Sequence, residues 1–185
     1  MGLTYKMREN EQRQGLINLC LNVQNYIGDD NLQLVEVGSY CGESSEIIAS
    51  NFLKSTLNCV DPWESYTEEG STYDLHQQSL ELKEAESLFD LVASKYNNII
   101  KNRLSSTQYA SQIEDKSIDF IYIDGNHQYA SIIEDLTIWN EKIKTGGIIA
   151  GHDFSWSPVS RAIYEFFDRA PVSVFEDGSW FYIKK

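Results

Sequence analysis

Hydrophobic residues recur at two spacings along the chain, and the alternation between these spacings predicts an α/β fold. Short apolar runs bounded by glycine, proline or polar turns predict buried strands, whereas apolar residues three and four positions apart predict amphipathic helices. The predicted strands are 32–37, 57–60, 98–101, 118–123, 148–150, 172–175 and 180–183. The predicted helices are 11–27, 43–53, 81–96, 106–113, 130–143 and 158–168.

The order of these elements predicts how the sheet is connected. Strands that alternate with helices form a parallel sheet covered on both faces, so we expect a doubly wound, mostly parallel sheet of seven strands. The last two strands flank Asp177-Gly178, a strong hairpin turn sequence, and we expect them to form a C-terminal antiparallel hairpin. The polar stretch 64–80 contains Gly70 and lacks helical periodicity, so we expect a long lid loop there.

Composition indicates a single acidic globular domain over residues 1–185, in which 1–31 form an N-terminal helical segment. The formal net charge of −13 argues against a nucleic-acid partner, because phosphates are bound through clustered Lys and Arg. The three cysteines show no C-x-x-C spacing, and no stretch has the length of a signal peptide or a bilayer span. We therefore expect a cytoplasmic protein with a small-molecule or basic substrate and no membrane partner, and we leave homo-oligomerisation open.

In a doubly wound sheet the ligand lies beyond the carboxyl ends of the strands, so the residues after each strand are informative. They are the segments 36–44, 61–63, 124–127 and 151–153. The first of these loops has Gly38 and Gly42 but lacks the G-x-G-x-x-G pattern, which disfavours a dinucleotide. Asp61 can accept both hydroxyls of a ribose, or it can cap the turn before Pro62.

Two of the three histidines follow adjacent central strands, and each stands near a carboxylate. His127 comes shortly after Asp124, and His152 directly precedes Asp153. With an ordinary pKa of about 6.5, His127 is the natural general base near neutral pH. Asp124, His152 and Asp153 can instead hold a divalent ion that orients a hydroxyl group and lowers its pKa. A structural role also stays open, in which the carboxylates cap loops and His127 bonds the backbone.

Three stretches resemble the class I S-adenosylmethionine-dependent methyltransferases, and more narrowly the family of macrolide-sugar (macrocin-type) O-methyltransferases. They are VEVGSYCGES at 35–44, VDPW at 60–63, and 118–154 with its D-G-N-H-x-Y and G-G-x-x-x-G-H-D patterns. The resemblance covers residues 32–154. It implies a Rossmann-like methyltransferase fold, S-adenosylmethionine as cofactor, and a hydroxyl of a small molecule, such as a sugar, as methyl acceptor.

The resemblance also assigns residues to the cofactor. They are Glu36, Gly38, Ser39, Gly42, Asp61, Trp63, Ser106, Gln108 and Asp124. The glycine loop is assigned to the methionine part, Asp61 to the ribose, and Trp63, Ser106 and Gln108 to the adenine. Trp156 is expected to pack against a helix rather than to stack on a substrate.

Methyl transfer from a sulfonium is an in-line displacement that needs an aligned, deprotonated nucleophile. Related metal-dependent O-methyltransferases use an acidic residue after the fourth strand and an acid–acid or acid–amide pair after the fifth. Here His152 takes the first position of that pair, which leaves a metal requirement open and shifts the preference from magnesium toward manganese, iron or zinc. Two other functions stay open. One is a metal-dependent hydrolase that uses Asp124, His127, His152 and Asp153, and the other is a cofactor-binding module without turnover.

Overall fold

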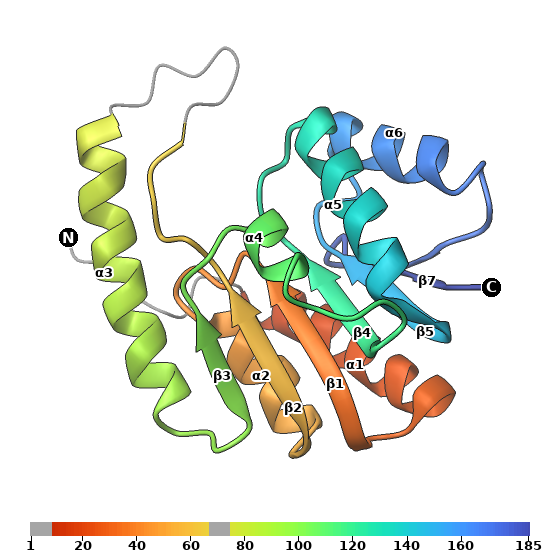
Figure 1. The fold of residues 1–185 in the computed structure, drawn as a ribbon, viewed down its shortest axis with the longest axis horizontal. Coiled ribbons are helices and arrows are strands. Elements are labelled where there is room, and N and C mark those ends of the chain that lie inside the picture. The colour runs from red at the N-terminus through yellow and green to blue at the C-terminus, as the bar shows by residue number, and fades with distance from the viewer. Residues whose placement is uncertain (1–8, 67–74) are drawn as a thin grey trace.

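The computed structural model describes residues 9–66 and 75–185, which form a seven-stranded sheet with helices on both faces (Figure 1). The strands are β1 (Asp30–Val37), β2 (Lys54–Val60), β3 (Ile99–Asn102), β4 (Ile118–Ile123), β5 (Ile143–Gly151), β6 (Ser173–Val174) and β7 (Trp180–Ile183). The helices are α1 (Asn10–Ile27), α2 (Glu43–Asn51), α3 (Leu75–Ala93), α4 (Ser106–Ala110), α5 (Tyr129–Lys142) and α6 (Ser157–Phe166). Among the described residues, no helix combines the length and the apolar character that crossing a membrane requires.

The strand order is β3-β2-β1-β4-β5-β7-β6, and β1 to β5 are parallel to their neighbours. The chain winds outward from β1 to β3 and then crosses back to place β4 beside β1. At the other edge β7 pairs antiparallel with both β5 and β6. These observations confirm the expected Rossmann-like, doubly wound sheet with its C-terminal hairpin. The strand order reverses between β1 and β4, where such sheets bind their ligands.

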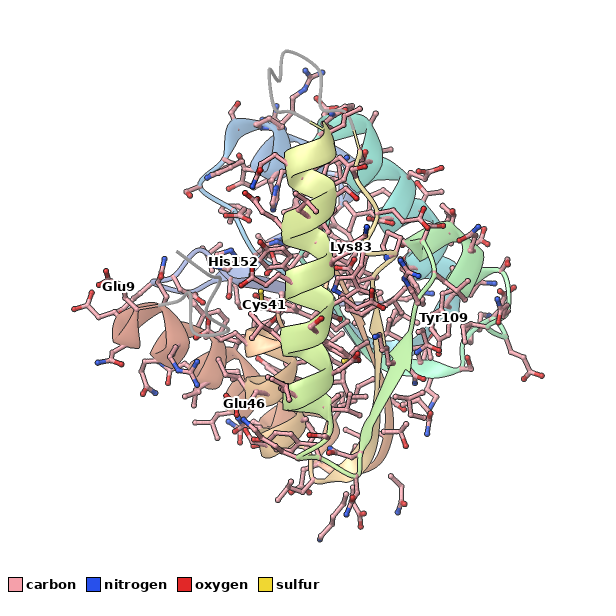
Figure 2. All side chains as sticks on the ribbon, turned by 90° about the vertical axis from the view of Figure 1, so that its left-hand side faces the viewer. Glu9, Cys41, Glu46, Lys83, Tyr109 and His152 are labelled. Atoms are coloured by element: carbon pink, nitrogen blue, oxygen red, sulfur yellow. The ribbon has the colours of Figure 1, made fainter. Side chains whose placement is uncertain are left out.

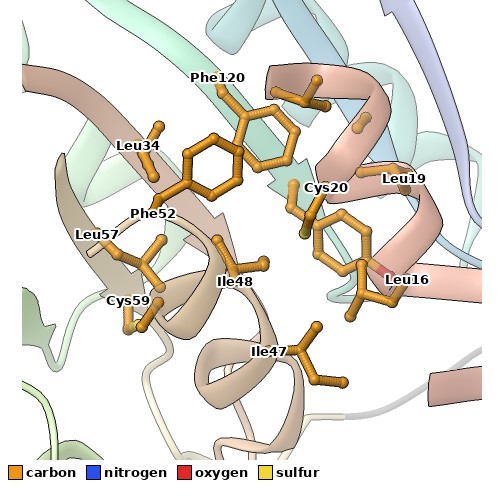
Figure 3. Packing of buried hydrophobic residues seen from close by; sticks show 14 of the residues in the cluster. Leu16, Leu19, Cys20, Leu34, Ile47, Ile48, Phe52, Leu57, Cys59 and Phe120 are labelled. Atoms are coloured by element: carbon orange, nitrogen blue, oxygen red, sulfur yellow. The ribbon is translucent and has the colours of Figure 1, made fainter. Parts of the chain in front are cut away.

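Alternate residues of the central strands supply two separate hydrophobic layers. Leu34 and Phe120 pack with α1, α2 and α3, whereas Val35 and Ile121 pack with α4, α5 and α6. Figure 3 shows the first layer, in which side chains of α1 and α2 lie over the strand residues. Because both faces of each central strand are buried, the strands read as apolar runs in the sequence.

Several predicted boundaries are wrong because a strand's backbone pairing continues through polar positions. β2 begins at Lys54 rather than 57, and β5 begins at Ile143 rather than 148. β1 begins at Asp30, inside the segment 1–31 that was expected to be helical or turn. The predicted helix 106–113 is too long, because α4 ends at Ala110.

The expected lid loop 64–80 is wrong over residues 75–80, because α3 begins at Leu75. Residues 67–74 lie outside the described part of the chain. Leu75 and Leu80 are each 48% exposed, so the first turns of α3 carry no buried stripe that would reveal a helix by its periodicity. Figure 2 views the molecule from the side on which α3 lies.

Candidate active site

A cleft of about 890 Å³ opens at the carboxyl ends of the parallel strands. Gly38, Asp61, Asp124 and His152, which follow β1, β2, β4 and β5, all line it. This volume lies within the roughly 300–1,000 Å³ of small-molecule sites. The strand ends that were expected to converge therefore meet in one cleft.

Gly38 allows the loop after β1 to lie directly against the loop after β4. Its φ is +87°, and a Cβ atom at this position would lie 2.2 Å from the carbonyl oxygen of Asp124. Backbone hydrogen bonds fix the contact, since Gly38 N donates to Val60 O at 2.9 Å and Asp124 N donates to Val37 O at 2.8 Å. Only glycine fits this position, and its bare backbone lets a ligand approach closely.

Asp61 joins the loops after β1 and β2. Its Oδ2 accepts a hydrogen bond from Tyr40 N at 3.0 Å, and its Oδ1 accepts one from Trp63 N at 2.7 Å. Burial raises the pKa of Asp61, against the lowering effect of these two bonds. Each carboxylate oxygen has a second lone pair, so Asp61 can still accept hydrogen bonds from the hydroxyl groups of a molecule in the cleft.

Ser106 and Asp135 form one side of the cleft. Ser106 Oγ donates to Asp135 Oδ1 and accepts a hydrogen bond from Trp139 Nε1 at 2.8 Å. Burial raises the pKa of Asp135 to about 6. Ser106 was expected at the adenine, and the structure adds Asp135 beside it.

Two residues of the expected cofactor set lie behind the cleft wall near α2. Glu36 has no exposed surface, and its carboxylate accepts hydrogen bonds from Ser39 and Ser45. Burial raises the pKa of Glu36 against the lowering effect of the serine hydroxyls. Gly42 makes the turn into α2 at a φ of +85°, where a Cβ atom would touch Val92 of α3 at 3.2 Å. Ser39, by contrast, lines the cleft as expected.

Trp63 and Gln108 also lie outside the cleft lining. The indole of Trp63 is 3% exposed, packs on Phe89 with ring centroids 5.0 Å apart, and donates to Tyr40 O at 2.9 Å. Gln108 forms a capping box with Ser105, so its amide turns back to the start of α4. Glu36, Gly42, Trp63 and Gln108 are thus not among the residues that line the cleft.

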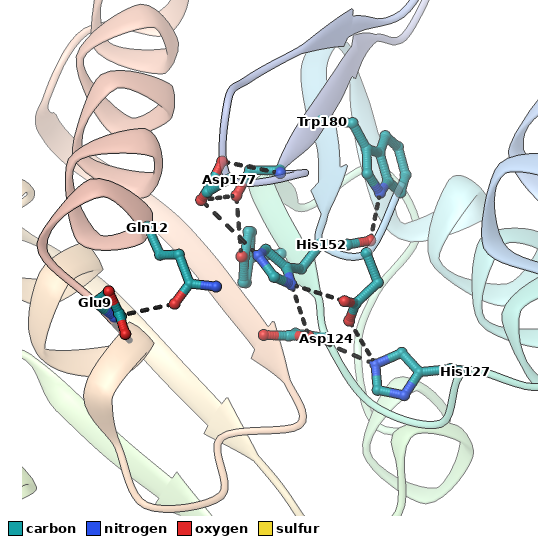
Figure 4. A network of polar contacts seen from close by, with 10 residues as sticks. Glu9, Gln12, Asp124, His127, His152, Asp177 and Trp180 are labelled. Atoms are coloured by element: carbon teal, nitrogen blue, oxygen red, sulfur yellow. Dashed lines mark hydrogen bonds and ion pairs between the residues drawn. The ribbon is translucent and has the colours of Figure 1, made fainter. Parts of the chain in front are cut away.

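Three ionisable side chains of the cleft lining, Asp124, His127 and His152, lie close together beside β4 and β5 (Figure 4). Asp153 is not among the lining residues and contacts both histidines. His127 Nε2 lies 2.8 Å from Asp153 Oδ2 and 3.8 Å from Asp124 Oδ1. His152 Nδ1 lies 3.2 Å from Asp153 Oδ1 and 4.0 Å from Asp124 Oδ1. The sequence placed all four residues at adjacent strand ends, and the structure brings them together.

The charges in this cluster alter its proton affinities. Asp124 and Asp153 raise the pKa of His127 to about 10, against the lowering effect of burial. Burial would raise the pKa of Asp153, but hydrogen bonds from His127 and His152 outweigh it and lower that pKa well below its usual range. His127 therefore holds its proton at neutral pH in this arrangement, which differs from the behaviour expected from its ordinary pKa.

Asp124, His152 and Asp153 lie close enough together that they could hold a metal ion. One ligand atom from each lies within 4.8 Å of the other two. Asp153 adopts a φ of +57°, an uncommon backbone conformation outside glycine that often marks functional positions. One nitrogen and two carboxylate oxygens suit divalent manganese, iron or zinc better than magnesium.

Three residues near the cleft were missed or misjudged from the sequence. Asp135 occupies a buried position on the apolar face of α5 beside Leu136, and that polar residue in an apolar stripe was a readable signal. Trp156 is 54% exposed with its ring 5.0 Å from that of His127, so the expected helix packing is wrong. Asp177 lies behind His152, and its Asp-Gly hairpin turn gave no hint of this contact.

The cleft lining is strongly acidic. Its carboxylates are Glu43, Asp61, Glu64, Glu81, Asp124, Glu134 and Asp135, and no Lys or Arg is among the described lining residues. This potential favours a cationic ligand.

Comparison with known proteins identifies the family. A methyltransferase domain model matches residues 35–154, which is more than half of the chain and includes the loops after β1, β2, β4 and β5. An uncharacterized protein of Acanthamoeba polyphaga mimivirus is 28% identical over 143 residues, which make up 74% of this chain and 59% of that protein. The chain therefore matches less than two thirds of the length of this curated relative.

Solved structures support the same fold. The precorrin-6y C5,15-methyltransferase of Geobacter metallireducens superposes with a TM-score of 0.63 at 14% identity, over 97% of this chain and 90% of that one. The apo TDP-rhamnose 3′-O-methyltransferase of calicheamicin biosynthesis has a TM-score of 0.58 at 13% identity, over 94% of this chain and 80% of that one. At these identities the likeness concerns the fold alone. The matched domain model shows that the chain belongs to the family of S-adenosylmethionine-dependent methyltransferase domains.

Proposed function

We propose that this protein transfers the methyl group of S-adenosylmethionine to a hydroxyl oxygen of a small molecule. The observation that carries the proposal is the cluster of Asp124, His127 and His152 in the acidic cleft, with Asp153 in contact with both histidines. Transfer to oxygen, unlike transfer to an activated carbon, needs a group that binds and deprotonates a hydroxyl, and this cluster offers both functions.

The cofactor would lie along the floor of the cleft. Asp61 would hold the ribose hydroxyls, and Ser106 and Asp135 would face the base. Gly38 would lie under the methionine part, whose sulfonium would point toward Asp124. All five of these side-chain or backbone positions line the cleft, together with Ser39.

A divalent metal would be held by Asp124, His152 and Asp153. When bound, it would act as a Lewis acid that orients the acceptor hydroxyl and lowers its pKa. His127 would then complete the site as the general base. The charges of Asp124 and Asp153 hold a proton on His127, so His127 would act as a base only after a bound cation had offset those charges and that proton had left the ring.

The acceptor would enter past His127 and lie on Trp156. An exposed indole offers an apolar face to a sugar or aromatic ring, and Trp156 is the tryptophan that contacts His127. The acidic lining, without a described Lys or Arg, favours a neutral or cationic acceptor over a phosphorylated one. A glycoside or a phenol therefore fits better than a nucleotide sugar.

Calorimetry with S-adenosylhomocysteine tests the cofactor site. We expect micromolar binding that weakens about 10- to 100-fold in Asp61→Ala, as loss of charge-assisted hydrogen bonds implies. Asp29→Ala is the matched control, because Asp29 is an exposed carboxylate at the opposite, amino end of β1. Absence of binding by the wild-type chain would remove the basis of the proposal.

The reaction itself is tested by release of S-adenosylhomocysteine, measured by mass spectrometry. Methyl α-rhamnoside and catechol serve as neutral acceptors, and TDP-rhamnose serves as the anionic comparison, each with and without Mn²⁺. We expect turnover of a neutral acceptor that requires Mn²⁺ and is lost in Asp124→Asn. Turnover of TDP-rhamnose alone would contradict the acceptor class, and turnover indifferent to chelators would contradict the metal.

A further inference from the structure

The loop after β1 turns at Tyr40, and residues that follow β2 hold both polar groups of the Tyr40 backbone. Tyr40 has a φ of +44°, in the left-handed region that non-glycine residues rarely adopt. Its N–H donates to Asp61 Oδ2 at 3.0 Å, and its carbonyl oxygen accepts a hydrogen bond from Trp63 Nε1 at 2.9 Å. The loop after β2 therefore binds the turn of the loop after β1 at a single residue.

The same contacts fix the carboxylate of Asp61. Its Oδ1 accepts a hydrogen bond from Trp63 N at 2.7 Å, and its Oδ2 accepts the one from Tyr40. Trp63 also has a left-handed backbone, with a φ of +46°. Such conformations cost free energy and persist where surrounding contacts enforce them, which happens most often at functional sites. Tyr40, Asp61 and Trp63 thus form a closed set of three hydrogen bonds.

The indole of Trp63 is anchored in turn by α3 and β3. It is 3% exposed and packs on Phe89 of α3, with ring centroids 5.0 Å apart. Lys101 of β3 places its Nζ 4.9 Å from the centre of the indole and pairs with Glu86 of α3 at 2.9 Å. The indole therefore has little freedom to move, and its N–H stays directed at the carbonyl oxygen of Tyr40.

We infer that Trp63 is a positioning residue, whose indole N–H holds Tyr40 in its left-handed turn and thereby keeps Asp61 oriented toward the cofactor. Tyr40 and Asp61 line the cleft, whereas Trp63 is not among the described residues that do. If the Tyr40 turn relaxed, the Asp61 carboxylate would lose one of the two N–H groups that orient it. This role differs from the contact with adenine that the resemblance implied for Trp63. The inference rests on the proposed function, because it takes Asp61 as the acceptor for the ribose hydroxyls.

A role of Trp63 confined to packing makes a different prediction. Trp63→Phe keeps an aromatic ring beside Phe89 and removes the N–H that binds Tyr40 O. Trp180→Phe is the matched control, because Trp180 is 2% exposed and its Nε1 donates to another backbone carbonyl oxygen, that of His152, at 3.2 Å. Each variant loses one indole–carbonyl hydrogen bond and part of a buried indole, so the two should lose similar thermal stability. Only Trp63→Phe should weaken cofactor binding.

The first experiment measures the affinity of the metal-free full chain for S-adenosylhomocysteine by calorimetry. We expect Trp63→Phe to bind about 3- to 10-fold more weakly than the wild type, the usual effect of losing one buried hydrogen bond. Trp180→Phe should bind as the wild type does. Equal affinities of the wild type and Trp63→Phe would overturn the inference.

The second experiment asks whether Asp61 has lost its orientation, a property that a packing role would not change. The probe is S-(2′-deoxyadenosyl)homocysteine, which lacks one of the two ribose hydroxyls. The wild type and Trp180→Phe should bind this analogue at least about 10-fold more weakly than S-adenosylhomocysteine, because a hydrogen bond to a carboxylate is lost. In Trp63→Phe the affinities for the two compounds should differ by no more than about 3-fold. A difference as large as that of the wild type would contradict the inference, even if Trp63→Phe bound both compounds weakly.

Phe89→Leu is the second variant, and it decides if Trp63→Phe does not fold. It keeps the indole N–H and a buried apolar side chain at position 89, but it removes the ring on which the indole packs. The looser indole should reduce the ratio of the two affinities in the same direction. An unchanged ratio would count against the positioning role.

The outcomes separate this inference from the proposed function. Wild-type discrimination between the two compounds that Trp63→Phe fully retains would overturn the role of Trp63 alone. Equal wild-type binding of both compounds would overturn Asp61 as the ribose acceptor, and the role of Trp63 with it, but not the cofactor. No wild-type binding of either compound would remove the basis of the proposed function and of the inference together.

Discussion

Gly38 and Asp124 touch through their backbones, and this contact joins the two halves of the sheet at the point where the cleft opens. A Cβ atom on residue 38 would lie 2.2 Å from the Asp124 carbonyl oxygen, a distance that no relaxation of a side chain can relieve. The loop after β1 and the loop that carries the start of the ionisable cluster therefore depend on one glycine.

We predict that Gly38→Ala destabilises the protein by about 3 kcal/mol or more and abolishes S-adenosylhomocysteine binding. A left-handed conformation costs a non-glycine residue about 1–2 kcal/mol, and the clash with Asp124 adds to this. Gly146→Ala isolates the first cost, because Gly146 has a φ of +82° with no atom within 4 Å of its added Cβ. Chemical denaturation of both variants measures the difference. Equal destabilisation would mean that the contact with Asp124 is not tight.

His127 gives a prediction with a defined pH window. Its pKa rises from 6.5 to about 10 in the folded protein because Asp124 and Asp153 face it. Between these values the folded chain holds a proton that the unfolded chain has lost. The stabilisation is therefore fully present below about pH 6.5 and is lost as the pH rises through about 10. We expect the free energy of unfolding of the wild type to fall over this window relative to that of His127→Gln.

An NMR titration of the His127 ring in the metal-free protein measures the same quantity directly. Asp153→Asn should bring the pKa of His127 down toward its ordinary value, whereas Asp115→Asn, which removes a carboxylate paired with Lys142, should leave it alone. A titration of wild-type His127 near 6.5 would show that the two carboxylates do not hold its proton.

Asp135 predicts a stability change in the acidic range. Burial raises its pKa from 3.8 to about 6, so the folded chain binds a proton more tightly than the unfolded chain does. The free energy of unfolding therefore decreases as the pH rises from about 4 to 6, by about 3 kcal/mol for this shift. Asp135→Asn keeps an acceptor for Ser106 and removes this dependence.

Denaturation of wild type and Asp135→Asn at pH 4 and pH 7.5 checks this prediction. The variant should gain stability relative to the wild type at the higher pH, and other buried acids such as Glu36 cancel in the difference. A constant difference between the two proteins would show that folding does not raise the pKa of Asp135.

The fold could be predicted from the sequence because each central strand is buried on both faces and therefore consists of a run of apolar residues. β4 and β7 were predicted with their observed bounds, since turns and polar residues flank them closely. The start of α3 could not be predicted in this way. A helix turn that faces solvent needs no apolar stripe, and the residues from Leu75 to Leu80 lack one.

Only the site residues that follow the end of a strand could be predicted from the sequence. Each of Asp61, Asp124 and His152 follows a parallel strand of the central sheet. The carboxyl ends of these strands lie at the same edge of the sheet, so the three side chains converge there. Trp63 was expected near the adenine, but its indole turns into the core just beyond the end of β2, as its left-handed φ of 46° allows. Asp177 reaches the cluster through pairing of β7 with β5, a long-range contact that local patterns do not encode.

The final prediction concerns Trp156, because the fluorescence of its indole reports on the edge of the site in solution. It is 54% exposed, whereas Trp63, Trp139 and Trp180 are each 3% exposed or less. Acrylamide should therefore quench the emission of Trp156 selectively, and Trp156→Phe should remove the quenchable fraction while leaving S-adenosylhomocysteine affinity unchanged.

An acceptor that lies on this indole must exclude acrylamide, so any compound the enzyme methylates should protect the emission at concentrations near its KM. Trp156→Ala should raise that KM more than it lowers kcat, since stacking contributes to binding on the indole before the methyl group moves. A methylated acceptor that leaves the quenching unchanged would place the acceptor on another side of His127.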